Sequence, residues 1–352
     1  MNEVSVHDAV EPLEREWDEL AKGSSPFLQP GWIAAWWRAF GKGELVILAV
    51  RRNGRLVAVL PLSLRRGVLH STTNWHTPVF GAVTLDREAA SALARGLLER
   101  SAHRVHLRFL PNDAPLVEEL RAAAGDIGYR VEERVMLRAP YVPVTGNWDG
   151  DWKMYWKHRS RNLRKSVRRL SHRLDELGTV TMEIAADADG LGKSLEEAFA
   201  VEASGWKGEQ GTAIISQPDT RRFYEEVAEW AAARGILRVV FLRVDERAVA
   251  MHLAIESGGD YSTLKSGYEE EFEKAGPGKL LDTMMMERAF KTGLDSVEFL
   301  GKDDEYKLIW TDQCHDRVEL QAFKRSPRGL LDRSVQVHGR SLARRAAALA
   351  RR

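Results

Sequence analysis

Residues 45–60 read LVILAVRRNGRLVAVL, and residues 237–252 read LRVVFLRVDERAVAMH. Each stretch is an apolar run, a short polar turn and a second apolar run, which is the pattern of a β-hairpin. Arg55 matches Arg247, so the two hairpins lie at an offset of 192 residues. The two stretches therefore predict an internal repeat.

The same offset continues beyond the hairpins. It pairs Phe80 with Phe272, the helical stretch 87–102 with 279–294, and the strand around Val105 with the strand around Val297. Helical stretches at 31–37 and 221–233 precede the two units, and each unit then reads strand, strand, strand, helix, strand. This order predicts an α/β (α+β) protein of two tandem lobes, each a mixed, mostly antiparallel sheet flanked by helices. The alternative is that any two hairpin–helix–strand units look alike.

Length and composition agree with two soluble lobes. A chain of 352 residues is about the length of two domains. Proline and glycine punctuate residues 140–150, so we expect an N-terminal lobe at 1–145, a C-terminal lobe at 146–325 and a basic helical tail at 326–352. The 52 Lys and Arg residues balance the 51 Asp and Glu residues, so overall charge selects no polyanionic partner and we expect no DNA binding.

We recognise no targeting signal and no membrane-spanning segment in the sequence. We find no signal peptide and no apolar run long enough to span a membrane, and Cys314 is the single cysteine. We therefore expect a cytoplasmic protein. The sequence contains no cluster of Cys and His residues, so it indicates no metal site. The oligomeric state is open.

A glycine-rich stretch distinguishes the second lobe. Residues 273–281 read EKAGPGKLL and precede a helix. Glycines expose backbone N–H groups, and the positive N-terminal end of a helix favours an anion. We expect Gly276, Gly278 and Lys279 to grip the phosphates of a donor, although an ordinary turn before a helix would look the same. The first-lobe counterpart, 81–86, ends in the acid Asp86 and predicts no such loop.

The order of elements and several short motifs resemble a known group of enzymes. The motifs are SPFLQPGW at 25–32, NWHTP at 74–78, GWKG at 205–208, PGKLL at 277–281 and FLG at 299–301. The chain resembles GNAT acyltransferases in duplicated form, as in the cellulose-biosynthesis acetyltransferase-like proteins of bacteria and the Fem-type aminoacyl transferases. The resemblance extends to about Lys324.

The resemblance implies transfer of an acyl group from an activated donor to an amine. In GNAT enzymes the donor is an acyl-CoA such as acetyl-CoA, with its pyrophosphate in the glycine loop. In Fem-type enzymes it is an aminoacyl-tRNA, and those enzymes often carry a coiled-coil arm for which we find no heptads. We therefore favour acyl-CoA, with an amine of a small molecule or of an envelope, polysaccharide or peptidoglycan precursor as acceptor. A non-catalytic binding protein of the same fold is the third hypothesis.

Three residues are candidates for the general base. His252 interrupts an alanine-rich face of the second hairpin, and imidazole accepts protons near neutral pH. Glu298 and Asp303 lie in and after the last strand of the repeat, where ligands gather in open sheets. A packed histidine and plain surface acids are the respective alternatives.

Four further residues are candidates for substrate binding. Trp206 and Lys207 lie between two glycines after a helix, and an aromatic ring with a cation suits a binding lip. Lys265 lies in the middle of a strand, and Tyr306 follows the last strand of the repeat. Trp206 could equally be a buried tryptophan at a helix end. Lys265 could equally be an edge lysine whose ammonium reaches solvent.

Two stretches are strongly basic. Residues 153–173 carry nine Lys and Arg residues on an apolar helical repeat, which predicts one amphipathic helix. Its basic face is either plain solvated surface or a contact for tRNA or another anionic partner. The arginine-rich tail after Pro327 is expected to be helical, and it would touch an acidic membrane surface or RNA, or hang loose.

Overall fold

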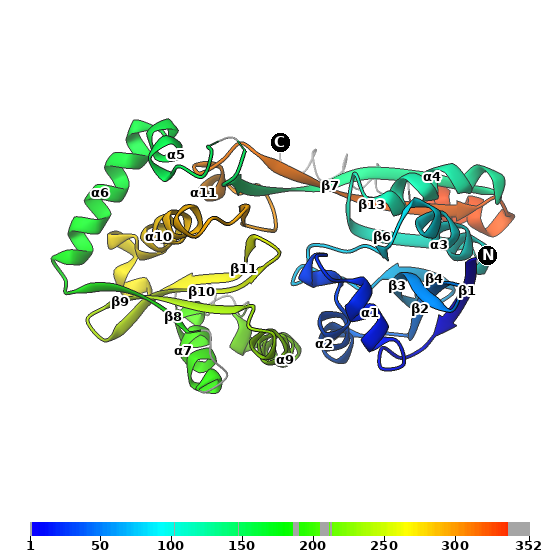
Figure 1. The fold of residues 1–352 in the computed structure, drawn as a ribbon, viewed down its shortest axis with the longest axis horizontal. Coiled ribbons are helices and arrows are strands. Elements are labelled where there is room, and N and C mark those ends of the chain that lie inside the picture. The colour runs from blue at the N-terminus through cyan, green and yellow to red at the C-terminus, as the bar shows by residue number, and fades with distance from the viewer. Residues whose placement is uncertain are drawn as a thin grey trace. The chain divides into compact units, whose positions relative to one another are not determined.

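The computed structural model describes residues 2–101, 103–146, 148–185, 190–204, 211 and 213–336 (Figure 1). The chain forms two compact units. Unit 1 comprises residues 1–37, 41–136 and 316–352, and unit 2 comprises residues 38–40 and 137–315. Each unit is a sheet with helices packed against it.

Unit 1 is built around the first predicted hairpin. In chain order its elements are β1 (Asn2–His7), α1 (Glu14–Leu20), η1 (Pro26–Leu28), α2 (Pro30–Phe40), β2 (Glu44–Arg52), β3 (Arg55–Arg65), β4 (Val68–Ser71), β5 (Val83–Thr84), α3 (Arg87–Arg100), β6 (Arg104–Pro111), α4 (Pro115–Asp126), the start of β7 (Tyr129–Pro143) and most of β13 (Cys314–Lys324). The strand order is β1-β2-β3-β4-β6-β13-β7, with β5 beside β3. Strands β4 and β6 pair in parallel.

Unit 2 repeats this plan. Its elements are the end of β7, α5 (Trp152–His158), α6 (Arg161–Asp175), β8 (Val180–Ala185), α7 (Leu191–Ala203), η2 (Ile214–Ser216), α9 (Pro218–Ala233), β9 (Leu237–Val244), β10 (Arg247–Ser257), β11 (Asp260–Tyr268), η3 (Glu270–Ala275), α10 (Pro277–Thr292), β12 (Ser296–Glu298), α11 (Glu305–Leu308) and the first residues of β13. The strand order is β7-β12-β11-β10-β9-β8. Strands β11 and β12 pair in parallel.

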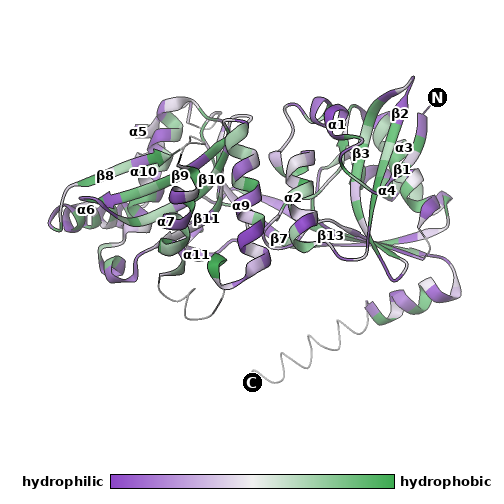
Figure 2. Ribbon diagram, turned by 90° about the horizontal axis from the view of Figure 1, so that it is seen from below, coloured by the Kyte–Doolittle hydropathy of each residue, from purple (hydrophilic) through white to green (hydrophobic). Residues whose placement is uncertain are grey.

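The predicted repeat is confirmed. Hairpins β2–β3 and β9–β10 are antiparallel, and their strands are coloured largely as hydrophobic in Figure 2. Val68 and Asp260 begin β4 and β11, and Arg104 and Ser296 begin β6 and β12, so both pairs keep the offset of 192 residues. The mixed α/β fold follows from this duplication.

The last strand of each repeat differs from the simple tandem arrangement. Strand β7 follows β6 along the chain but pairs with β12, and β13 follows β12 but pairs with β6. Unit 1 therefore includes residues from 316 onward, which the predicted ranges placed in the second lobe and the tail. Residues 327–336 are helical, and Arg333 forms an ion pair with Glu132 at 2.6 Å.

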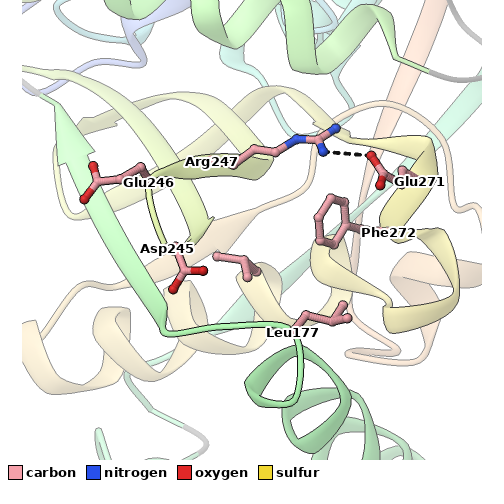
Figure 3. Close-up of a pocket in the computed structure, with 7 residues that line it drawn as sticks. Leu177, Asp245, Glu246, Arg247, Glu271 and Phe272 are labelled. Atoms are coloured by element: carbon pink, nitrogen blue, oxygen red, sulfur yellow. Dashed lines mark hydrogen bonds and ion pairs between the residues drawn. The ribbon is translucent and has the colours of Figure 1, made fainter.

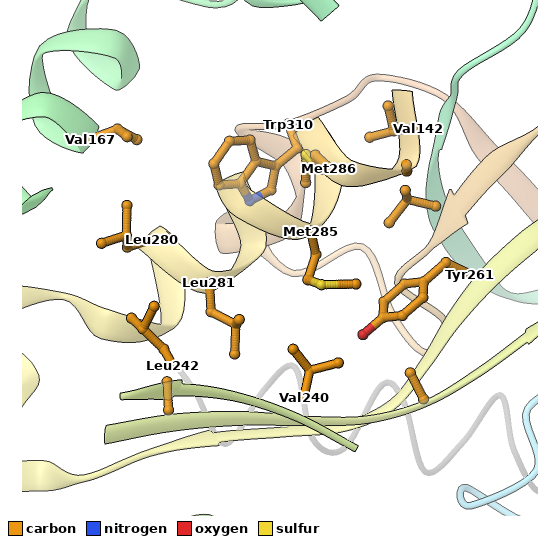
Figure 4. Close-up of a cluster of buried hydrophobic side chains, with 14 of the residues drawn as sticks. Val142, Val167, Val240, Leu242, Tyr261, Leu280, Leu281, Met285, Met286 and Trp310 are labelled. Atoms are coloured by element: carbon orange, nitrogen blue, oxygen red, sulfur yellow. The ribbon is translucent and has the colours of Figure 1, made fainter. Parts of the chain in front are cut away.

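Helix α10 is the centre of the core of unit 2. Leu281 is fully buried, and Leu280, Met285 and Met286 are at most 7% exposed. These side chains pack among Val240, Leu242, Tyr261 and Trp310 (Figure 4). A helix that is buried on most of its surface has a fixed position, so side chains at its N-terminal end are held in place by the core.

The basic stretch forms two helices instead of the single predicted one. Arg159 is extended, and the Ser160 hydroxyl accepts a hydrogen bond from Leu163 N at 3.1 Å, which starts α6 anew. Leu163, Val167, Leu170 and Leu174 then form the buried face of α6. The predicted amphipathic pattern is thus correct. Ser160, an N-cap residue within the stretch, is the sequence signal that indicates two helices instead of one. Among the described helices, none combines the length and apolar character that crossing a bilayer requires.

Candidate functional site

Unit 2 contains a cavity of about 500 Å³ beside the N-terminal end of α10. Its walls come from α7, β10, β11, η3, α10 and the α11 segment. The described lining residues are Glu202, Ser204, His252, Ser266, Gly267, Tyr268, Glu270, Glu273, Gly278, Lys279, Asp282, Tyr306, Ile309 and Trp310. Its volume lies within the usual range for small-molecule sites.

Diverging strands make room for this cavity. Strands β11 and β12 pair only where Asp260–Ser262 faces Ser296–Glu298. Strand β11 continues to Tyr268 without β12 beside it, and a bulge between Leu253 and Ala254 disturbs its pairing with β10. The edge of β11 beyond Ser262 is therefore not covered by β12, and His252 lies on β10 opposite Ser266 in this part of β11.

His252 is the centre of a buried polar group in the cavity wall. Its Nε2 lies 3.2 Å from Asp282 Oδ1, and its Nδ1 lies 3.3 Å from the Tyr261 hydroxyl. Burial raises the pKa of Tyr261, so its hydroxyl keeps its proton and can donate it to Nδ1. That arrangement leaves the proton of a neutral imidazole on Nε2, facing Asp282. His252 is 3% exposed, whereas the Asp282 side chain is 19% exposed.

The glycine loop lies in the same wall. Gly276 precedes α10 with a φ of +61°, and no side chain caps the helix. The first intrahelical bond is that of Leu280 N to the Gly276 carbonyl at 3.3 Å, so the N–H groups of Gly278 and Lys279 have no acceptor within the helix. Both residues line the cavity. This end of α10 can therefore receive an anion.

The equivalent helix of unit 1 is closed to an anion. The Asp86 side chain caps α3 by accepting a hydrogen bond from Ala89 N at 2.8 Å. Hydrogen bonds from Arg52 and from the Ala89 backbone lower the pKa of Asp86 to about 2, so the carboxylate is charged. The acid thus occupies the end of α3 at which an anion would have to bind.

Trp310 and its supports form another part of the wall. Its carbonyl accepts hydrogen bonds from the Tyr155 hydroxyl at 2.9 Å and from Arg159. The guanidinium of Arg159 also lies over the Tyr155 ring. Tyr155 of α5 and Arg159, between α5 and α6, thereby hold Trp310, just after α11, in place.

The acidic side of the cavity comes from α7 and η3. Gly267 lets α7 approach β11 closely, because a Cβ there would lie 2.6 Å from Glu202 Cα. Glu202 is 1% exposed and accepts a hydrogen bond from Ile214 N at 2.9 Å. The Ser204 hydroxyl accepts from Glu270 N at 3.0 Å and so ties η3 to the end of α7.

The structure brings together only some of the predicted site residues. Five of them line the cavity or form the turn beside it: His252, Gly276, Gly278, Lys279 and Tyr306. Lys265 instead places its ammonium 5.4 Å from the centre of the Tyr224 ring of α9. Trp206 and Lys207 lie outside the described residues.

The other two predicted acids lie elsewhere in unit 2. Glu298 is 9% exposed and takes part in a separate polar cluster, in which the Ser296 hydroxyl lies 2.8 Å from Glu298 Oε1 and His315 Nε2 lies 3.3 Å from it. Asp303 lies 3.9 Å from Arg138 and is 40% exposed. Neither acid lines the cavity among its described residues.

Asp282 is the main site residue that the sequence analysis missed. It lies four residues after Gly278, and residues four apart share one face of a helix. Helical periodicity from the glycine loop would therefore have indicated it. The acids of η3 gave no comparable signal, because four neighbouring glutamates read as ordinary surface.

A second hollow in unit 2, of about 480 Å³, lacks such chemistry. It lies at the turn between β9 and β10, where the Arg247 guanidinium binds Glu271 at 2.7 Å beside Phe272 (Figure 3). Arg247 and Glu271 are already paired with each other there, so we place the candidate functional site at the first cavity.

The comparisons with known proteins agree with this architecture. Residues 161–308 match the family model of the acetyltransferase (GNAT) domain. No curated protein matches the chain in sequence. The matched segment spans α6 to α11 and thus includes the glycine loop, His252, Asp282 and all of the described cavity lining except Ile309 and Trp310.

Solved structures resemble the chain over nearly its whole length. FemX has a TM-score of 0.59 at 14% identity, covering 94% of this chain and 99% of FemX. The C-terminal domain of a putative lysylphosphatidylglycerol synthetase from Agrobacterium fabrum has a TM-score of 0.57 at 12% identity, covering 93% and 97%. At these identities the likeness concerns the fold, and it confirms the predicted resemblance to GNAT proteins with Fem-type relatives.

Proposed function

We propose that the protein is an N-acyltransferase that uses an acyl-CoA donor and works in the cavity of unit 2. The observation that carries this proposal is the position of Asp282, backed by His252, one helical turn from the free N–H groups of Gly278 and Lys279. A proton acceptor and an anion-binding helix end in one cavity are what transfer from an acyl-CoA to an amine needs.

In this proposal the glycine loop holds the donor. The backbone N–H groups of Gly278 and Lys279, with the Lys279 ammonium, would bind the pyrophosphate of the acyl-CoA. The acceptor nitrogen would then attack the thioester carbonyl carbon, forming the C–N bond, and the C–S bond would break to release the thiolate. The amine would lose one proton and the thiolate would gain one, so the transfer is balanced in protons.

Asp282 is the proposed proton acceptor, and His252 positions it. Both nitrogens of His252 have partners, whereas Asp282 has a second carboxylate oxygen and a partly exposed side chain. The Nε2–H group would fix the carboxylate so that its other oxygen receives the proton of the amine. This assignment keeps the predicted importance of His252 but makes it act through Asp282.

The test is donor binding followed by turnover. Isothermal titration with acetyl-CoA should give micromolar affinity, and release of free thiol should require an added amine. Absence of acetyl-CoA binding, with intact fold, would reject the acyl-CoA reading.

Aminoacyl transfer from an aminoacyl-tRNA is the second candidate, and one observation favours it. Lys153, Lys157, Arg161, Lys165, Arg168 and Arg169 of α5 and α6 are exposed and have no acidic partner among the described residues. Helix α6 also lies beside the glycine loop, because a Cβ on Gly276 would come within 2.8 Å of Leu170. Salt-sensitive binding of bulk tRNA without binding of acetyl-CoA would favour this candidate, and binding of neither would favour a non-catalytic protein.

A further inference from the structure

The lining of the cavity is strongly acidic. Its described residues include four carboxylates and one lysine, with His252 not counted: Glu202, Glu270, Glu273, Asp282 and Lys279. The chain as a whole has 52 basic and 51 acidic residues, so this imbalance is local. A concave, low-dielectric surface of one sign concentrates ligands of the other sign.

The four glutamates of η3 and its N-cap fall into two pairs with different surroundings. Glu269 and Glu271 both form ion pairs with Arg247, at 3.3 and 2.7 Å. Glu270 and Glu273 line the cavity instead and have no cationic partner within the part of the chain that the structure describes. Both side chains are exposed and Glu273 has the Tyr268 hydroxyl as a hydrogen-bond partner, so two carboxylates are left without a cation for a ligand that enters the cavity.

Aromatic rings lie in the same lining. Tyr268 comes from β11 and Tyr306 from α11, and the Lys307 ammonium already lies 5.4 Å from the centre of the Tyr306 ring, whereas Trp310 is fully buried. The face of an aromatic ring attracts an ammonium group, most strongly where water is excluded. Rings and carboxylates together make a surface suited to a cation, and this observation is independent of the charge count.

A simple monoamine does not fully explain this surface. Nearby carboxylates favour the protonated form of an amine, whereas only the neutral amine can attack the donor. If the reacting nitrogen were the sole cation, the four acids would hold it in its unreactive form. A second cation that stays charged would satisfy Glu270 and Glu273 while the first nitrogen loses its proton to Asp282.

We infer that the acceptor is a diamine or a longer oligoamine, whose second, non-reacting ammonium group is held by Glu270, Glu273 and the aromatic rings. The inference rests on the proposed acyl transfer for the fate of the first amine. The binding preference itself does not depend on turnover. It also disfavours an acceptor that carries phosphate or carboxylate groups into this cavity.

The binding test compares three ligands of similar length with the full-length protein. Cadaverine carries two ammonium groups, pentylamine carries one, and aminocaproate carries one together with a carboxylate. By isothermal titration at low salt we expect cadaverine to bind about tenfold more tightly than pentylamine, and aminocaproate to bind most weakly. Raising the salt concentration should reduce the preference. Equal affinities for the three ligands would overturn the inference.

Matched variants locate the effect. Glu273→Gln and Glu270→Gln should each reduce cadaverine affinity by about tenfold and leave pentylamine affinity nearly unchanged. Glu271→Gln changes the same charge on the same segment, but Glu271 binds Arg247 away from the cavity, so this control should behave as the unaltered protein (Figure 3). An equal loss in Glu271→Gln would mean that bulk charge of η3, and not the cavity, sets the preference.

Failure of the inference and failure of the proposed function give different results. Acetyl-CoA-dependent acylation of pentylamine and cadaverine with equal efficiency would reject the second-cation site and keep the acyltransferase. Tight, Glu273-dependent cadaverine binding without thiol release from acetyl-CoA would keep the cation site and reject the acyl-CoA reaction.

Discussion

Nε2 of His252, on strand β10, lies 3.2 Å from Oδ1 of Asp282, on helix α10. The contact joins the sheet to the helix at the wall of the cavity. Tyr261 occupies the other ring nitrogen, so the imidazole is fixed on both sides. In the proposed function the histidine held in this way orients Asp282, whose second carboxylate oxygen would meet the ligand.

This relationship predicts different effects for two substitutions. Asp282→Asn removes the proposed proton acceptor and should lower kcat/KM about 10²- to 10⁴-fold in the thiol-release assay. His252→Gln keeps a donor for Asp282 and should cost about tenfold or less, mainly in kcat, with an altered pH profile. Larger losses in His252→Gln than in Asp282→Asn would reverse the roles.

The glycine loop predicts a size-matched pair of variants. A Cβ on Gly278 would lie 3.5 Å from Tyr268 Cδ1, which is an ordinary contact, so the loop accommodates alanine. Gly278→Ala should bind acetyl-CoA within about threefold of the unaltered protein, since the backbone N–H groups stay. Gly278→Glu places a carboxylate at the anion-binding end of α10 and should weaken binding by about 100-fold or more. Isothermal titration measures both, and unchanged affinity in Gly278→Glu would reject the loop as the donor site.

Much of the fold could be predicted from the periodicity of neighbouring residues. The alternating runs of β2–β3 and β9–β10, and the offset that relates them, are properties of neighbouring residues, so the repeat was visible in the sequence. The exchange of β7 and β13 was not visible, because a strand with the same apolar alternation fits beside β6 or β12 equally well. Pairing partners far apart in the chain leave no local signal.

The candidate site shows the same division. Gly276, Gly278 and His252 stand out because each is an unusual residue for its element. Asp282, Glu270 and Glu273 do not, because charged residues are common on helices and only the opening beside β11 makes them line a cavity. Glu298 and Asp303 had an equal claim from the sequence, yet the first lies in a polar cluster with Ser296 and the second lies beside Arg138.

Gly276 predicts a stability effect that a second substitution should partly relieve. Its φ of +61° strains any other residue, and a Cβ would meet Leu170 Cδ1 at 2.8 Å. Gly276→Ala should lower the free energy of unfolding of unit 2 by about 1–3 kcal/mol. In a Leu170→Ala background the same change should cost less, because only the backbone strain remains. Additive costs in hydrogen-exchange or denaturant measurements would contradict the steric part.

Buried titratable groups of unit 1 predict that acid weakens it. Burial, followed by the charges of Arg65, His106 and Arg104, lowers the pKa of His70 from 6.5 to about 3. Burial opposes ionisation of Glu319, but hydrogen bonds from His106 and Arg134 lower its pKa from 4.5 to about 2. In both cases the unfolded chain binds a proton that the folded unit does not. Stability should therefore fall as the pH drops from 6.5 toward 3, and fall further below 4.5.

Hydrogen exchange of peptides from β4, β6 and β13, measured between pH 7 and 4, checks this expectation once rates are corrected for intrinsic exchange. His70→Gln should flatten the decline between pH 6.5 and 4.5, because the titrating group is gone. Glu319→Gln should cost about 1–3 kcal/mol already at pH 7, since His106 and Arg134 lose the charged acceptor that both of them bind. That loss should appear first in β13, because Glu319 joins this strand to His106 of β6 and Arg134 of β7. An unchanged pH slope in His70→Gln, with β13 as protected as before in Glu319→Gln, would mean that other groups set the acid stability of unit 1.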